Sequence, residues 1–542
     1  MRRRDFIATG VMAGAFALAP GFLREALAAP ATPGPGPYGP LQPPNEAGLM
    51  LPEGFTGRRL VRGNRLVEGT LYPWHIASDG QATFRTRDGG FILVSNSESP
   101  AVTGGGASAI RFSPDGRIER AYRILAGTNI NCAGGPTPWG TWLSGEEHPL
   151  GMIWEADPAG VLPAVPRPAM GNFCHEAAAV DPERGQVYMT EDEPDGGFYR
   201  FTPDDYPSLA SGLLEVAVVA TDGRVTWREV PDPNVVTRLQ PTRRQVPEMT
   251  KFNGGEGIWH DNGVIYFTTK GDKRVWAYDA AAERLEVLYD HRQTPDAALD
   301  AVDNITVAAS GDIFVCEDGG NMEIGLITPD REVSAFCRLV GDEHEGSELC
   351  GVIFDPSQTR MYFSSQRAYP WIPGTPVADG AIYEVTGPFR IPEGGVPERY
   401  VFGPPAGERT TLGDWLVGDL LGLVRGLLVE LTERIGLDDL LSGGLPLTLG
   451  LERPATVDLV LRTPDLRPVS RGDGTHDRPV PVTLARARHD LGRGRHALRL
   501  GLPGDAVRAL TARTGLDAVL TVVAHASDGR RRVTAHRLRL GA

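Results

Sequence analysis

One short hydrophobic unit recurs along the chain. A glycine or turn residue precedes a short apolar run, which ends in polar or acidic residues. Six copies lie at residues 90–98, 140–147, 185–192, 263–272, 311–318 and 359–367. With residue 360 as the start of the last copy, the intervals are 50, 45, 78, 48 and 49 residues. Repeats of roughly 45 to 50 residues with several short strands each are typical of β-propeller blades.

Turn signals fall between these runs and support the same interpretation. They include residues 113–116, 157–160 and 261–263, together with the Asp-Pro pairs at 181–182 and 355–356. The one long interval holds an insertion, residues 204–250, which is rich in proline and charge and which we expect to fold over one rim. The sequence therefore predicts an all-β fold, a propeller of six four-stranded blades over residues 45–405.

The N-terminus has the features of an export signal. Arg3 and Arg4 form a twin-arginine pattern, and a weakly hydrophobic run leads to a small-residue cleavage site at residues 26–28. The run is short for a transmembrane span and is broken by Pro20 and Gly21. We expect residues 1–28 to be a signal peptide for the twin-arginine export machinery, which moves folded proteins, and residues 29–44 to be a Pro/Gly-rich linker. The protein would then be periplasmic, secreted or held in the cell envelope.

The C-terminal region has a different pattern. Apolar residues recur every three or four positions over residues 410–442, which predicts one or two amphipathic helices too charged to span a membrane. Residues 450–542 alternate apolar and polar positions in short runs, which predicts a small β-sandwich. Such an addition more often serves attachment or stability than chemistry.

Charge is unevenly distributed. The net charge is -15, yet residues 451–542 carry 17 Arg against 9 Asp and Glu, a balance of +8 that leaves -23 on residues 1–450. An acidic main body argues against a nucleic-acid partner and suits a protein that collects cations. The arginines of the tail are scattered among apolar residues, which favours a solvated face over a binding arm.

The stretch at residues 131–147 combines a thiol with two carboxylates. Cys132 is followed by a Gly-Gly-Pro turn and a short aromatic strand, and Glu146 and Glu147 come where that strand ends. Thiolate and carboxylate together are ligands for a hard or borderline metal ion. Taken alone, the stretch is equally consistent with a buried small cysteine and two solvated glutamates.

Other polar residues occupy comparable places in the repeat. Equivalent strand ends of a propeller converge on one mouth of the channel, so these residues should become neighbours. Carboxylates gathered in one cavity repel one another unless cations neutralise them. Besides Cys132, Glu146 and Glu147, the candidates are His175, Glu176, Glu191, Asp192, Glu256, Asp303, Asn304, Glu317, Asp318 and Glu348.

The chain has five cysteines, Cys132, Cys174, Cys316, Cys337 and Cys350. An odd number leaves at least one free thiol in an exported protein, and we expect Cys132 to be unpaired. None of them has the two-residue spacing of a zinc ribbon. Pairing among the other four stays open.

Several motifs together resemble the PhoX family of secreted alkaline phosphatases. They lie at residues 131–147, 175–181, 256–259, 269–272, 303–305 and 314–319, and the resemblance covers about residues 45–400. It implies a six-bladed propeller that works as a monomer, binds Fe3+ and Ca2+ at the channel mouth and hydrolyses the phosphate monoester of a small phosphorylated substrate.

The resemblance also implies roles for individual residues. Cys132 and Glu147 would ligate iron, while Glu176 and Glu256 would join an iron and calcium cluster. The pairs Glu191-Asp192, Asp303-Asn304 and Glu317-Asp318 would hold or support calcium. Oxygen ligands suit calcium, and a thiolate with carboxylates can hold ferric iron.

One position departs from the family pattern. Longer members have a phosphate-gripping arginine two residues before the glutamate that is Glu256 here, and this chain has Gly254. Lys270 and Arg274 are the nearest cationic candidates by repeat position, although both could be ordinary surface residues. Glu256, Lys270 and Arg274 are therefore the candidate catalytic residues.

Two other functions remain open. A calcium-dependent propeller lactonase would use the same acidic funnel with one calcium and no thiolate. A non-catalytic binding propeller of the cell envelope would account for the missing arginine and for the extra C-terminal domain. Metal analysis separates the three: iron with calcium indicates the phosphatase, calcium alone the lactonase, and neither metal the binding protein.

Overall fold

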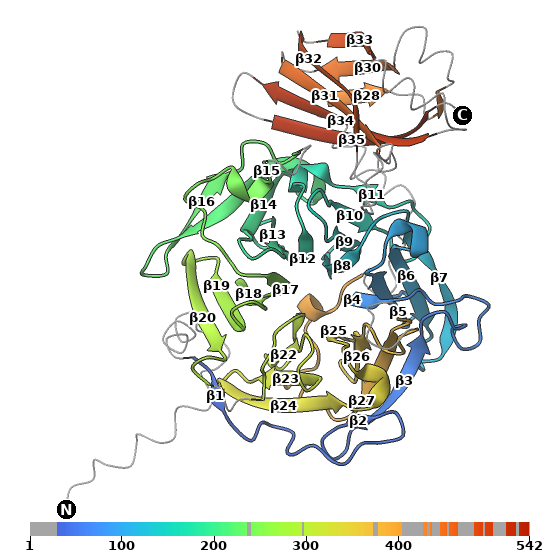
Figure 1. Cartoon of the computed structure of the whole chain (residues 1–542), viewed down its shortest axis with the longest axis vertical. Coiled ribbons are helices and arrows are strands. Elements are labelled where there is room, and N and C mark those ends of the chain that lie inside the picture. The colour runs from blue at the N-terminus through green and yellow to red at the C-terminus, as the bar shows by residue number, and fades with distance from the viewer. Residues whose placement is uncertain are drawn as a thin grey trace, which may run out of the picture.

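The computed structural model describes residues 30–235, 240–294, 298–371 and 378–403, and beyond these a set of C-terminal strands with residue 501. Six sheets, built almost entirely of antiparallel pairs, are arranged as blades around a common centre (Figure 1). This confirms the predicted six-bladed propeller. The predicted signal peptide, residues 1–28, lies outside the described residues.

Blades 1 to 3 follow one another along the chain, each with its first strand nearest the channel (Figure 1). Their strands are β4 (Ser78–Arg85), β5 (Phe91–Ser97), β6 (Gly106–Phe112) and β7 (Ile118–Ala126) in blade 1; β8 (Asn131–Pro136), β9 (Trp142–Glu146), β10 (Ile153–Ala156) and β11 (Val165–Pro166) in blade 2; and β12 (His175–Asp181), β13 (Gln186–Glu191), β14 (Phe198–Asp205), β15 (Ser208–Val219) and β16 (Val225–Glu229) in blade 3.

Blades 4 to 6 complete the ring. Their strands are β17 (Gly255–Asp261), β18 (Val264–Thr269), β19 (Arg274–Asp279) and β20 (Arg284–Asp290) in blade 4; β21 (Ile305–Val307), β22 (Ile313–Cys316), β23 (Glu323–Ile327) and β24 (Glu332–Leu339) in blade 5; and β25 (Leu349–Phe354), β26 (Arg360–Ser365), β27 (Ala381–Thr386) and β3 (Thr56–Arg62) in blade 6. The repeated hydrophobic unit of the sequence is the second strand of each blade.

The ring is closed by a strand from the N-terminal side of the repeat region that pairs with a strand at its C-terminal end. β3 comes from the N-terminal side and pairs antiparallel with β27, from Thr56 opposite Thr386 to Arg62 opposite Ala381. Blade 6 therefore combines strands from both ends of the propeller region. Sequence repeats alone did not reveal this closure.

Two blades have more than the four predicted strands. In blade 3 the insertion forms β15 and β16, which extend the sheet outward, and then returns through the short helix η3 (Thr242–Arg244). In blade 5, β1 (Thr32–Pro33) and β2 (Leu49–Met50) both pair with β24. Residues 30–44, predicted as a linker, therefore lie against blade 5, where Tyr38 packs edge-on against Phe55 and Phe336.

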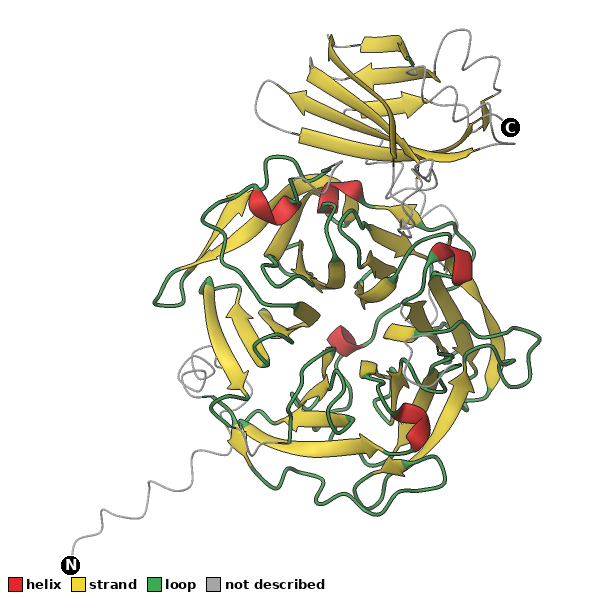
Figure 2. Ribbon diagram, in the orientation of Figure 1, coloured by secondary structure: helices red, strands yellow, loops and turns green. Residues whose placement is uncertain are grey.

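The chain crosses the channel after the last blade. A short helix, η5 (Glu398–Tyr400), lies near the centre of the ring (Figure 2). The hydroxyl of Tyr400 donates to Asp261 at the end of β17, and Arg85 at the end of β4 pairs with Glu398. The first strands end at this face of the ring. We call the opposite face, where they begin, the entry face.

The remaining described helices are short 3-10 turns, η1 (Ala101–Thr103), η2 (Pro168–Met170) and η4 (Asp342–His344). In the part of the chain that the structure describes, no helix is long and apolar enough to cross a membrane.

The C-terminal strands form two sheets, in the order β28-β30-β33 and β29-β35-β34-β31-β32. Leu445, Leu447 and Leu449 of one sheet and Val457, Leu459 and Leu461 of the other are buried at alternate positions, as in a β-sandwich. The strands are β28 (Leu427–Glu430), β29 (Arg434–Ile435), β30 (Leu445–Leu451), β31 (Ala455–Thr463), β32 (Val482–Leu491), β33 (Gly494–Leu500), β34 (Leu516–Ala526) and β35 (Arg531–Leu540).

The helical prediction for residues 410–442 is not supported where the structure describes them. β28 and β29 fall inside that range and are strands, paired with β30 and β35. A short apolar run such as Leu427-Leu428-Val429 is compatible with either structure, and here sheet pairing decides it. The other residues of the range lie outside the described part of the chain.

Candidate metal and active site

The first strands of five blades have a β-bulge at the entry face, in blade 6 between Cys350 and Ile353 and in the other four at the start of the strand. The pairing register shifts between Ser78 and Gln81, Asn131 and Gly134, His175 and Ala178, and Gly255 and Ile258. A bulge leaves residues out of the ladder and redirects their side chains. The residues placed inside these four bulges include Asp79, Cys132, Glu176 and Glu256.

These side chains meet in the channel. The Sγ of Cys132 lies 3.2 Å from Oε1 of Glu176 and 3.5 Å from Oδ2 of Asp79. Candidate ligand atoms lie within 4.8 Å of one another in three overlapping groups: Asp79, Glu98 and Cys132; Cys132, Glu147 and Glu176; and Glu176, Glu256 and Asp303. We call these seven residues the channel cluster.

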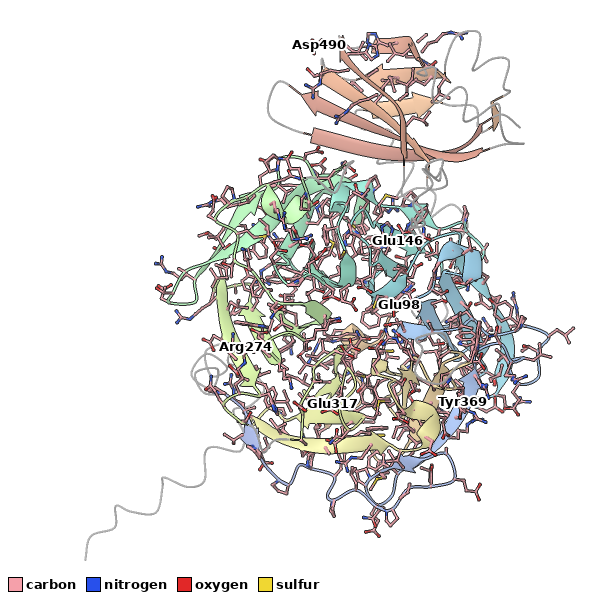
Figure 3. All side chains as sticks on the ribbon, viewed as in Figure 1. Glu98, Glu146, Arg274, Glu317, Tyr369 and Asp490 are labelled. Atoms are coloured by element: carbon pink, nitrogen blue, oxygen red, sulfur yellow. The ribbon has the colours of Figure 1, made fainter. Side chains whose placement is uncertain are left out.

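The second strands contribute to the same face at the residue after each strand. Glu98, Glu147 and Asp192 directly follow β5, β9 and β13, and Lys270 follows β18 in the same way. In blade 5, Asp318 lies two residues beyond β22. Figure 3 shows Glu98 near the centre of the ring.

In three acidic pairs of the sequence, the first member points away from the cluster. Glu146 accepts hydrogen bonds from the backbone of Asn129 and the indole of Trp154. Glu191 is bonded to Tyr199 and Arg243, and Glu317 accepts from the backbone amides of Asp300 and Glu323. Successive residues of a strand face opposite ways, so only one member of each pair can face the channel. Glu146 accordingly lies farther from the centre than Glu98 in Figure 3.

The electrostatics of the cluster show the cost of gathering these acids. Burial, followed by repulsion from Asp79 and Glu176, raises the pKa of the Cys132 thiol well above its usual range. Burial and then the charge of Glu256 raise the pKa of Glu176, and burial and then Asp79 raise the pKa of Glu98 to about 7. The same causes act on Glu147 and Asp303, whose pKa values are also raised.

This arrangement fits bound cations. Oε2 of Glu176 is buried and has no hydrogen-bond partner among the described residues. A buried carboxylate oxygen left without a donor is costly unless another positive group satisfies it. Because the donors are one thiol and six carboxyl groups, the channel cluster provides groups suited to metal ions.

Two cationic side chains reach the cluster. Nζ of Lys270 lies 2.7 Å from Oε1 of Glu256 and 2.7 Å from Oδ2 of Asp192. Nη1 of Arg367 lies 2.8 Å from Oε1 of Glu348, and Nη2 lies 3.5 Å from Oε2 of Glu98. Burial lowers the pKa of Lys270, but the charges of Glu256 and Asp192 outweigh it, and the net shift is upward.

Arg274, the other predicted catalytic cation, is placed differently. Its guanidinium pairs with Asp272 and Asp290 at 2.9 Å each and lies over the ring of Trp276. Figure 3 shows it well away from the centre of the ring. The structure brings Lys270, and not Arg274, to the cluster.

Residues 73–152 and 148–368 match the family described as "Alkaline phosphatase PhoX". These residues make up more than half of the chain. The chain belongs to the PhoX family. Membership implies phosphomonoesterase activity and agrees with the resemblance seen in the sequence motifs.

The other comparisons add little to the PhoX assignment. A search of curated proteins finds no match. Among solved structures, regucalcin from Agrobacterium tumefaciens is 16% identical with a TM-score of 0.32, over 62% of this chain and 97% of that one. A chain of a nidogen/laminin complex is 15% identical with a TM-score of 0.32, over 52% of this chain and 93% of that one. Likenesses this remote carry no argument about function.

The PhoX motifs occupy the entry face. Cys132, Glu176 and Glu256 lie in the bulges, and Asp303 lies just before β21. Asn304 binds Asp303 at 2.9 Å and accepts from the backbone amide of Gly351, so it braces the cluster from blade 5. Glu348 also lies on this face, held by Arg367.

Three residues of this face were not predicted. Asp79 stands in Ser78-Asp79-Gly80, which resembles a turn, and only the register shows that it lies in a bulge like that of Cys132. Glu98 and Arg367 were visible as polar ends of the first and last repeats. Comparison of Glu98 with Glu147 at the same repeat position would have found the first of them.

The local structure explains why position 254 holds glycine and not the arginine of longer family members. Its φ is +69°, in the left-handed region that favours glycine, and a Cβ there would lie 2.9 Å from Cγ of Lys270. The carbonyl of Gly254 also accepts from the backbone amide of Lys270 at 2.8 Å. A side chain at position 254 would start in the space that Lys270 occupies, so glycine at this position allows the lysine to reach Glu256.

All five cysteines are buried and none forms a disulfide. Cys132 is the one that lies in a candidate ligand group of the described residues.

Proposed function

We propose that this PhoX-family protein hydrolyses small phosphate monoesters at a metal site formed by the channel cluster. The observation that carries the proposal is the convergence of one thiol and six carboxyl groups from five blades at the entry face, with Lys270 beside them. Family membership supplies the reaction class.

We assign the metals as Fe3+ and Ca2+, following the donor types. Cys132, Glu147 and Glu176 would hold iron, because the family resemblance assigns Cys132 and Glu147 to iron and Glu176 completes a thiolate and two-carboxylate group with them. Glu256 and Asp303, braced by Asn304, would hold calcium together with Glu176, while Asp79 and Glu98 form a further group with Cys132. Asp192, Asp318 and Glu348 would support the cluster from its rim.

The hydrolysis is a displacement at phosphorus. The oxygen of water forms a bond to phosphorus, the bond to the ester oxygen breaks, and the leaving oxygen takes a proton, which gives an alcohol and inorganic phosphate. Bound metal ions would polarise the phosphoryl oxygens and offset the charge that develops during displacement. Lys270 would add one positive charge at the cluster, where its ammonium group is paired with Glu256 and Asp192.

The surroundings of the site indicate from which face a substrate would enter. The short helix η5 and its contacts with Asp261 lie at the face opposite the cluster, so substrate would enter from the entry face. We propose that the protein works as a monomer after folded export by the twin-arginine pathway. Its location would then be the periplasm, the medium or the cell envelope.

The test is hydrolysis of an aryl phosphate by metal-loaded protein, with metal content measured in the same sample. A chelator should abolish turnover, and iron with calcium should restore it. Glu256→Gln should be nearly inactive, because the exchange removes a charged donor from the cluster. Glu384→Gln is the matched control, since Glu384 is equally buried, with 4% of its side chain exposed, but lies in blade 6 with Arg58 and Arg360.

Absence of phosphomonoester hydrolysis by the metal-loaded parent would contradict the proposed activity. Equal turnover by the parent and Glu256→Gln would contradict the site.

A further inference from the structure

Arg367 is placed where it can contact a ligand of the channel cluster. It follows β26 in blade 6, and its side chain is 31% exposed, while its guanidinium lies beside Glu348 and Glu98, whose side chains are 11% and 17% exposed. It is not among the residues implied by the family resemblance. Lys270 has a comparable place in blade 4, so the two cations reach the cluster from separate blades.

The backbone around Arg367 is fixed in place. Its amide donates to Oγ of Ser347 at 2.9 Å, and the amide of the preceding residue, Gln366, donates to the carbonyl of Glu348 at 3.1 Å. The side-chain amide of Gln366 donates to Asp79 in the cluster. The segment that carries the guanidinium is therefore held by hydrogen bonds. Less conformational entropy would be lost when Arg367 binds a ligand than if it lay on a free loop.

Among the described residues, the ion-pair partners of Arg367 are Glu348 and Glu98, which leave part of its donor capacity unused. Nη1 is 2.8 Å from Glu348, but Nη2 is 3.5 Å from Glu98, too far for a strong charge-assisted hydrogen bond. A guanidinium has five N–H donors in a planar fork that matches a phosphate. Glu98 belongs to the channel cluster, so a phosphate held at the cluster would lie close to this fork.

We propose that Arg367 binds the phosphate of the substrate from blade 6, as Lys270 reaches the cluster from blade 4. Arg367 would thereby replace the arginine that position 254 lacks. The proposal rests on the proposed function for its ligand, a phosphate monoester, and the same fork would hold the inorganic phosphate product. The competing interpretation is that Arg367 only neutralises Glu348 and Glu98.

The experiment is calorimetric titration of inorganic phosphate into the full-length, metal-loaded protein, with iron and calcium measured in every sample. Arg367→Gln should weaken phosphate binding by at least tenfold at unchanged metal content, and Arg367→Lys should fall between it and the parent. Glu348→Gln should tighten binding at unchanged metal content, because it frees the guanidinium from its nearest acid.

Arg360→Gln is the matched control. Arg360 lies at the other end of the same strand, is 29% exposed and pairs with the buried Glu384 at 3.1 Å, but faces away from the site. The Arg360→Gln protein should bind phosphate with the affinity of the parent. Loss of a surface-to-buried ion pair is thus common to both variants, and only the place of the arginine differs.

Parental phosphate affinity in Arg367→Gln at equal metal content would overturn the proposal. So would a loss of affinity that follows a loss of metal, because Arg367 would then act only through the ions. Failure of the parent to bind phosphate would also overturn it. Aryl phosphate turnover is measured separately, so a parent that binds phosphate through Arg367 but hydrolyses no ester would refute the proposed function and leave this inference standing.

Discussion

The Sγ of Cys132 lies 3.2 Å from Oε1 of Glu176, although each is the second residue of the first strand of a different blade. Both lie inside β-bulges at the same repeat position. The bulge turns the side chain of each out of its ladder and into the channel. The thiol is thus buried and surrounded by carboxylates, and burial first and then these negative charges raise its pKa. A metal ion would reverse that effect, because a coordinated thiol is deprotonated.

Cys132→Ser should therefore lower iron content more than any other cysteine substitution. An alkoxide is far harder to form than a thiolate at neutral pH, so serine cannot replace the thiolate donor. Cys337→Ser is the control, since Cys337 is also buried, in β24, but lies outside the candidate groups of the described residues. Metal analysis of the purified proteins measures the effect. Equal iron in Cys132→Ser and the parent would show that the thiolate is not a ligand.

Arg243 anchors the insertion of blade 3 beside the site. It lies 3.0 Å from Glu191, 3.1 Å from Glu193 and 2.7 Å from Asp195, with 9% of its side chain exposed. Arg243→Met should lower the free energy of unfolding by roughly 3 to 5 kcal/mol, because it leaves the buried Glu191 without its counter-charge. Urea denaturation measures this loss.

The double variant separates charge from packing at Arg243. Glu191→Gln in the Arg243→Met background should recover part of the lost stability, since the uncompensated charge is gone. If the two substitutions are additive in a double-mutant cycle, Arg243 does not act through Glu191.

The sequence predicted the ring because each blade repeats the same apolar second strand. It also predicted that Cys132, Glu147, Glu176, Glu256 and Asp303 would converge, since equivalent strand ends meet at one mouth. Closure by β3 was not predictable from the repeat, because β3 comes from outside it and its pairing with β27 is a long-range contact.

The strand register was needed to decide which of the predicted ligand residues face the channel. Glu146 and Glu147 are adjacent and chemically alike, and strand alternation sends one to the backbone of blade 2 and the other to the channel. The sequence shows that the two glutamates are adjacent, but it does not show which of them faces the channel. Asp79 was missed for a related reason, since a bulge that contains Asp-Gly has the composition of a turn.

His344 should make stability depend on pH. It is buried beside Ser365 and Tyr383, and burial lowers its pKa to about 4. The unfolded chain, with a histidine pKa of about 6.5, takes up the proton first as pH falls. Stability is therefore lost between about pH 6.5 and 4, by about 2 kcal/mol between pH 7 and 5. His344→Gln should remove this part of the loss in urea denaturation at the two pH values; equal losses in parent and variant would contradict the assignment.

Gly254 provides the sharpest test of how this chain differs from its arginine-bearing relatives. Its φ of +69° costs about 1 kcal/mol for any residue with a Cβ, and that Cβ would lie 2.9 Å from Lys270. Gly254→Ala should therefore lower both stability and turnover, the latter because Lys270 must move from Glu256. Gly69→Ala is the control, with a φ of +71° and nothing within 4 Å of the added Cβ.

Restoring the arginine should not restore a family-like site. Gly254→Arg adds a charge at the cluster, but it carries the same backbone strain and displaces Lys270, so we expect weaker phosphate binding than in the parent. The comparison of Gly254→Ala with Gly69→Ala isolates the clash from the strain, because both positions share the left-handed backbone. If Gly254→Arg binds phosphate more tightly than the parent while Gly254→Ala keeps full turnover, then Lys270 is not the cation on which the site depends.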